Sequence, residues 1–168
     1  FLGSTFCLEL TEHILLGSGN TYDVYDVSDT AYEGGTEDPS VPPPGDQIDY
    51  ETAYLYYHFL NNTLSYGGYT YGSNDINQDA WDLQMAIWFF EDEITSIDSN
   101  NKWYQAAIND NSNLAYGAQA MNLYDHGTED LAQSHLTSAS VPEPATMLIF
   151  GTGLFALAGF GRRKFRKK

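Results

Sequence analysis

The sequence predicts an α+β domain followed by a short membrane-spanning helix. Segments with strand-like patterns lie at both ends of residues 1–138, and segments with helical periodicity lie between them. We expect a β-sandwich or barrel-like sheet formed by the N- and C-terminal strands, with a helical insertion. Residues 139–144 form a proline-containing linker, and residues 145–168 combine a hydrophobic helix with a basic tail. One folded domain, one linker and one C-terminal hydrophobic segment with a basic tail are therefore expected.

Four segments carry the strand predictions. Residues 5–14 partly alternate apolar with polar side chains, and residues 21–27 are rich in Tyr and Val. Residues 119–124 and 131–136 flank the turn-forming residues 125–127, a pattern that predicts a hairpin near the end of the domain. The first and last segments are expected to close the sheet.

Three segments carry the helix predictions. Residues 50–62 have apolar side chains at helical spacing and follow Asp49, which can act as the N-cap. Residues 79–95 show the most regular apolar stripe, and acidic side chains near their start suit the helix dipole. A shorter helix is expected over residues 102–108, with Ser99 as the candidate cap.

Charge divides the chain into an acidic body and a basic end. Asp and Glu outnumber Lys and Arg by 23 to 7, and the formal net charge is −16. Lys102 is the one basic residue of residues 1–161, and the others lie in residues 162–168. Such a body excludes a nucleic-acid partner, since phosphates are bound by basic surfaces. The four histidines show no metal-ligand spacing and no nucleotide-binding fingerprint occurs, so we expect no metal and no cofactor.

The C-terminal segment has three consecutive parts. Pro142, Glu143 and Pro144 precede the uncharged residues 145–160, and basic residues follow. A helix over residues 145–160 is about 24 Å long, against about 30 Å for a bilayer core. Basic side chains after the span extend its reach and stop its transfer across the membrane. The residues expected to act as this stop are Arg162, Arg163 and Lys164.

These three parts closely resemble the PEP-CTERM sorting signal of exported Gram-negative proteins. The resemblance covers residues 141–168. It implies an exported chain that is anchored in the inner membrane through residues 145–160 and then cleaved near the Pro-Glu-Pro motif by an exosortase-type enzyme. It further implies delivery to the cell surface or to the extracellular matrix. A buried C-terminal helix is the alternative interpretation.

The body contains a second resemblance, carried by two short motifs. Cys7, the single cysteine, follows Phe6 in a predicted strand, and Gln84 lies in a predicted helix that reads Leu83-Gln84-Met85-Ala86-Ile87-Trp88. This pair resembles the thioester (TQXA) domain of bacterial surface adhesins, over roughly residues 1–136. The Thr of the TQXA form is replaced by Leu83.

The resemblance implies that Cys7 and Gln84 form an isopeptide-like thioester with loss of ammonia. The bond would then react with an amine or hydroxyl on a surface or matrix partner, once per molecule, so the protein is not expected to be an enzyme in the usual sense. Water must be excluded from such a bond. The apolar residues expected to shield it are Phe6, Trp81, Trp88 and Phe89. An inert buried thiol and a solvated Gln are the alternative interpretation of the pair.

A second function stays open at this point. Tyr and Trp side chains, including those of the Gly/Tyr-rich residues 65–74, can stack on sugars. The chain would then be a structural, non-covalent polysaccharide-binding protein of the exopolysaccharide or biofilm matrix, with the same fold and no reactive bond. A hydrolase is not favoured, because no hydrolase motif occurs.

Overall fold

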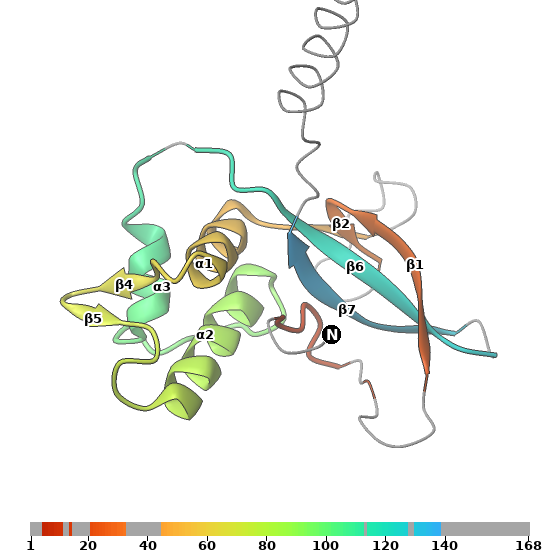
Figure 1. Ribbon diagram of the computed structural model, residues 1–168, viewed down its shortest axis with the longest axis horizontal. Coiled ribbons are helices and arrows are strands. Elements are labelled where there is room, and N and C mark those ends of the chain that lie inside the picture. Colours follow the sequence, from red (N-terminus) through yellow and green to blue (C-terminus); the bar gives the residue numbers. More distant parts are fainter. Residues whose placement is uncertain are drawn as a thin grey trace, which may run out of the picture.

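The computed structural model describes residues 5–11, 14, 21–32, 45–112, 114–127 and 130–138. In this part of the chain the helices form one side of the molecule and a three-stranded sheet forms the other (Figure 1). The elements in chain order are β1 (Tyr22–Ser28), β2 (Thr30–Ala31), β3 (Asp46–Gln47), α1 (Tyr50–Leu60), β4 (Ser65–Tyr66), β5 (Tyr69–Thr70), α2 (Ile76–Phe90), α3 (Lys102–Ile108), β6 (Ala118–Asp125) and β7 (Leu131–Ser138).

The main sheet is antiparallel, with strand order β1-β6-β7. The hairpin β6–β7 confirms the predicted one, and its register pairs Ala120 with Leu136 and Met121 with His135. The prediction of a barrel-like sheet is wrong for the described residues, because no sheet there closes on itself. A barrel requires both edge strands to find partners. Here β1 pairs with β6 alone, and the chain builds separate two-stranded sheets from β2–β3 and β4–β5.

The N-terminal segment touches the sheet at one point rather than as the predicted strand over residues 5–14. Cys7 forms an isolated antiparallel bridge with His135. Leu8 N donates to Ser134 O at 3.0 Å, but Leu10 N donates to a carboxylate oxygen of Glu93 at 2.8 Å. The ladder ends because the next backbone donor in line is taken by a side chain of another segment.

All three predicted helices are confirmed, although α2 begins earlier than predicted and α1 and α2 both end earlier. Asp49 occupies the N-cap position of α1 but makes no capping hydrogen bond with its side chain. Helix α2 begins at Ile76 rather than at residue 79, because the Asp75 side chain accepts from Asn77 N and Gln78 N. Helix α3 begins at Lys102 as predicted, and its cap is Asn101 rather than Ser99.

Asp79 lies in the first turn of α2, near the helix start as predicted, and it also makes tertiary contacts. Its side chain is buried inside α2 and lies 3.0 Å from Lys102 Nζ. Its other carboxylate oxygen accepts from Gly72 N at 2.8 Å. Asp79 therefore joins α2 to α3 and to the loop before α2.

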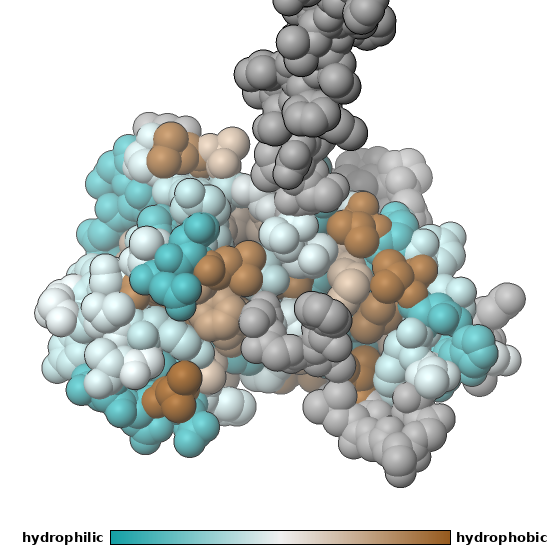
Figure 2. Space-filling view, in the orientation of Figure 1, coloured by the Kyte–Doolittle hydropathy of each residue, from teal (hydrophilic) through white to brown (hydrophobic). Residues whose placement is uncertain are grey.

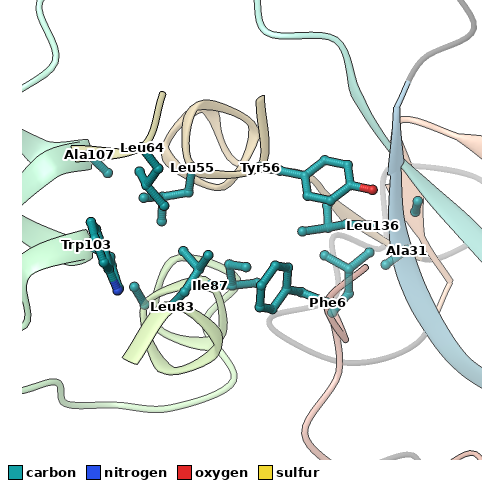
Figure 3. Close-up of a cluster of buried hydrophobic side chains, with 13 residues drawn as sticks. Phe6, Ala31, Leu55, Tyr56, Leu64, Leu83, Ile87, Trp103, Ala107 and Leu136 are labelled. Atoms are coloured by element: carbon teal, nitrogen blue, oxygen red, sulfur yellow. The ribbon is translucent and has the colours of Figure 1, made fainter. Parts of the chain in front are cut away.

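The core lies between the helices and the sheet. Figure 3 shows side chains from α1, α2 and α3 on one side and Leu136 of β7 on the other. Phe6 points from the N-terminal segment into this core, with its ring 4.9 Å from that of Phe59 in an edge-to-face contact. Leu83 and Ile87 of α2 are fully buried there. Burial of Phe6 and Leu8 fixes the position of Cys7 between them.

Residues 65–70 of the Gly/Tyr-rich segment form the small hairpin β4–β5. Gly67 and Gly68 both have positive φ, at 58° and 85°, which a two-residue turn of this kind requires. Figure 2 shows that hydrophobic side chains on the visible face gather over the sheet, while hydrophilic ones separate them over the helices. Val24 and Val27 of β1 are among the exposed hydrophobic residues.

No helix within the described residues is long and apolar enough to cross a membrane. The predicted transmembrane helix, residues 145–160, lies outside the described residues.

Candidate functional site

The candidate site forms where the N-terminal segment passes between α2 and β7 (Figure 1). Leu136 N donates to Phe6 O at 2.9 Å and Leu8 N donates to Ser134 O at 3.0 Å, so Cys7 and His135 are a non-hydrogen-bonded antiparallel pair. In such a pair the backbone N–H and C=O of each residue point away from the partner strand. The backbone groups of Cys7 are thereby turned toward α2.

Gln84 of α2 meets both of these backbone groups. Cys7 N donates to Gln84 Oε1 at 3.0 Å, and Gln84 Nε2 donates to Cys7 O at 2.8 Å. Because the backbone offers one donor and one acceptor, only one orientation of the carboxamide satisfies both bonds. The structure brings together the two residues that the sequence singled out, although they are 77 positions apart.

The thiol of Cys7 is half-buried and protonated at neutral pH. Burial, and to a smaller extent the nearby Glu9 carboxylate, raises the pKa of the Cys7 thiol to about 11. The thiol belongs to the single cysteine of the chain and is free. A nucleophilic role for Cys7 therefore needs a group that removes its proton.

His135 is the residue of this site that sequence reasoning missed. It lies opposite Cys7 in the bridge, and its side chain is 3% exposed. Neither ring nitrogen has a hydrogen-bond partner among the described residues. Burial lowers the pKa of His135, so its imidazole is neutral at physiological pH. No sequence spacing could reveal this pair, because the register of β7 against the N-terminal segment brings it together.

The four predicted shielding residues differ in their burial and in their position relative to Cys7 and Gln84. Phe6 is buried in the core, next to Cys7. Trp81 and Trp88 lie on the same face of α2 as Gln84, with their rings 6.2 Å apart, but Trp81 is 57% exposed. Phe89 instead packs toward α3, with its ring 5.3 Å from that of Tyr104. Phe6 and Trp88 are therefore better placed to exclude water than Trp81 or Phe89.

No group of three His, Cys, Asp or Glu side chains within the described residues is arranged to hold a metal ion. The predicted sorting and stop residues lie outside the described residues. They are Pro142, Glu143, Pro144, Arg162, Arg163 and Lys164.

Comparison with known proteins identifies the C-terminal segment. Residues 140–167 match the family model of the PEP-CTERM protein-sorting motif. No curated protein and no solved structure matches the chain. The matched motif supports an exported protein that is anchored in the membrane before an exosortase processes it.

Proposed function

We propose that the folded body is a covalent adhesion module in which Cys7 and Gln84 form an internal thioester. The observation that carries the proposal is the pair of reciprocal hydrogen bonds, at 3.0 and 2.8 Å, between the Gln84 carboxamide and the Cys7 backbone. They hold an electrophile against the backbone of the residue that carries the one thiol of the chain. Holding two reactants in fixed geometry supplies much of the barrier lowering that a poor electrophile such as an amide needs.

The same hydrogen bonds suit the chemistry of thioester formation. Attack of Cys7 Sγ on Gln84 Cδ moves negative charge onto Gln84 Oε1, which already accepts from Cys7 N. A donor about 3 Å from a developing oxyanion is the arrangement that stabilises tetrahedral intermediates. Collapse of the intermediate expels ammonia and leaves Sγ bonded to Cδ. An amine or hydroxyl of the partner then attacks this bond and releases the thiol.

The body is poor in amines that would consume the bond internally. Lys102 is the one lysine of residues 1–161, and its ammonium lies 3.0 Å from the buried carboxylate of Asp79. An amine held as an ammonium in an ion pair is a weak nucleophile. The module would therefore react with an external partner, once per molecule, and so would not act as an enzyme.

The sorting motif places this module outside the cell in the same proposal. Residues 1–138 form the adhesion domain, residues 139–144 the linker that is cut, and residues 145–168 the signal that stays at the membrane. Cleavage near the Pro-Glu-Pro motif releases the acidic body to the cell surface or extracellular matrix of a Gram-negative bacterium.

Intact-mass spectrometry of the full-length chain, purified in detergent, tests the proposal. The wild type is expected to be lighter than its sequence by one ammonia, and Cys7→Ala is expected to have its full calculated mass. Methylamine should add to the wild type and not to the variant. A wild type of full mass, with a thiol that titrates in the folded state, would rule out the thioester.

A second candidate function is non-covalent binding of polysaccharide. Tyr50 and Tyr57 are exposed on α1, and their rings lie 5.5 and 5.2 Å from the ring of Tyr116. Asp110 accepts from the hydroxyls of Tyr50 and Tyr116 and adds polar groups beside these rings. If this surface carries the function, Tyr57→Ala will abolish retention on an exopolysaccharide column and Cys7→Ala will not.

A further inference from the structure

We infer that His135 is the general base that takes the thiol proton of Cys7 and delivers it to the departing ammonia during thioester formation. The inference rests on the proposed thioester and assigns a residue to a step that Cys7 and Gln84 cannot complete by themselves. It starts from the bridge between the N-terminal segment and β7, which is independent of the contact with Gln84.

The backbone geometry places the imidazole and the thiol on one face of the sheet. Side chains of a directly opposed, non-hydrogen-bonded pair have Cβ atoms about 4.5 to 5.5 Å apart. Phe6 and Leu8 point to the opposite face, where they join the core, so Cys7 points away from it together with His135. Staggered rotations of the two side chains bring Sγ–H to a ring nitrogen, and such bonds often tighten only when the reaction proceeds.

The state of His135 suits the role of a proton acceptor. Its side chain is 3% exposed and both ring nitrogens are without a partner in the part of the chain that the structure describes. Buried polar atoms are nearly always hydrogen-bonded in folded proteins, so an unsatisfied imidazole requires an explanation. A neutral imidazole beside a protonated thiol is the pair of protonation states from which general-base catalysis starts.

The proton balance of the step is complete. The imidazole nitrogen removes the proton from Sγ as Sγ bonds to Gln84 Cδ. The imidazolium then donates that proton to Gln84 Nε2 as the Cδ–Nε2 bond breaks, and ammonia leaves. His135 ends as it began, neutral, and no oxidant, metal or other reactant takes part.

The other groups around Cys7 and His135 are less suited to act as the general base. Glu9 is the second titratable group of the N-terminal segment here, and its carboxylate accepts from the Ser134 backbone N–H. β6 presents Met121 opposite His135, and α2 presents the uncharged Gln84. The rate of thioester formation is therefore expected to follow the protonation of His135.

The test measures the rate at which the full-length chain loses ammonia. The chain is recovered from inclusion bodies and refolded in detergent with Cys7 held as a glutathione mixed disulfide. Addition of a reductant then frees the thiol and starts the reaction. His135→Gln is expected to slow the mass loss at least about 100-fold. The matched control is His126→Gln, which alters an exposed histidine and is expected to leave the rate unchanged.

The pH profile of the wild type gives a second readout, which does not depend on whether His135→Gln folds. A neutral imidazole base predicts that the rate falls on acidification through the pKa of His135 and reaches a plateau above it. Without this base the rate follows the thiolate, and it rises tenfold per pH unit toward the Cys7 pKa of about 11. A log-linear rise without a plateau, or His135→Gln at the wild-type rate, overturns the role of His135 while the thioester stands. A wild type that never loses ammonia overturns the proposed function itself.

Discussion

Two carboxamides, the fully buried one of Asn122 and the half-buried one of Gln84, hold distant parts of the chain together in different ways. Asn122 of β6 is fully buried, and its Oδ1 accepts from Tyr32 N at 3.1 Å and from Ser134 Oγ at 2.8 Å. Its Nδ2 donates to oxygens of three residues, Asp26, Ser28 and Thr30. Gln84 instead binds one residue, Cys7, beside an imidazole that has no partner among the described residues.

These different surroundings suggest a structural role for the Asn122 amide and a reactive role for the Gln84 amide. Around Asn122 both amide atoms have two or more hydrogen-bond partners. Within the described ranges Gln84 binds only the backbone of Cys7, and His135 lies opposite that residue in the bridge. Fully satisfied polar networks rigidify a fold, whereas partly satisfied ones at buried positions mark functional sites.

The largest expected effect on stability comes from the structural amide. Asn122→Ala leaves several buried polar atoms without partners and is expected to lower the free energy of unfolding by about 3 kcal/mol or more. Urea denaturation of the full-length chain in detergent measures it. The variant should still lose ammonia where it folds. A loss below about 0.5 kcal/mol would show that the Asn122 network is not structural.

Gln84→Ala is expected to reduce stability less than Asn122→Ala but to abolish the loss of ammonia. Loss of two hydrogen bonds lowers the free energy of unfolding by about 2 kcal/mol, less than at Asn122. The same change abolishes loss of ammonia completely, because the acyl carbon is gone. Gln78→Ala on the exposed face of the same helix is the matched control. Persistent loss of ammonia in Gln84→Ala would assign the electrophile to another residue.

Glu91, the cap residue at the end of α2, extends the comparison to a buried group that titrates. Burial, together with the nearby carboxylates of Asp46 and Asp49, raises the pKa of Glu91 to about 8. The folded state therefore holds a proton that the unfolded state releases near pH 4.5, so stability decreases as pH rises toward 8. Between about pH 6.5 and about pH 7.5 the decrease is about 1.4 kcal/mol.

Glu91→Gln is expected to remove this slope, because Gln resembles the protonated acid. The chosen window lies above the pKa of about 6 to which burial raises Asp46. His135 is neutral in the folded state and gains a proton on unfolding near pH 6.5, but this contribution is the same in both proteins and cancels in their difference. Thermal unfolding of wild type and variant at the two pH values measures the difference. Equal slopes in both proteins would show that Glu91 is ionised in the folded state.

The smallest expected effect comes from a polar group at the surface. The Asp75 side chain caps α2 through Asn77 N and Gln78 N, at 3.0 and 3.2 Å. Asp75→Ala is expected to cost about 1 kcal/mol and to leave ammonia loss at the wild-type rate. A change in that rate would mean that the start of α2, and not only Gln84, positions the carboxamide.

Local patterns in the sequence predicted much of the fold. The apolar stripe of α2 and the turn between β6 and β7 depend on neighbours within a few residues, and both elements formed where expected. The start of α2 lies before the predicted one, because Asp75 caps the helix through its side chain. Asp79 in the first turn also makes a tertiary contact with Lys102, which no local pattern records.

In the candidate site, too, local motifs predicted some residues, while others depend on tertiary structure. Cys7 and Gln84 could be paired from the sequence because each lies in a recognisable motif. His135 could not, because it becomes a neighbour of Cys7 only through the register of β7, and that register depends on burial of Phe6 and Leu8. The exposure of Trp81 and the turn of Phe89 toward α3 likewise follow from helix packing.

The most direct test of the thioester is to locate the methylamine that the full-length wild type takes up. Tandem mass spectrometry of the digested protein is expected to place it on Gln84, as the γ-glutamyl methylamide. Uptake should release one titratable thiol per chain, that of Cys7. A Cys7 thiol that titrates fully before methylamine is added, together with an unmodified Gln84, would contradict the account.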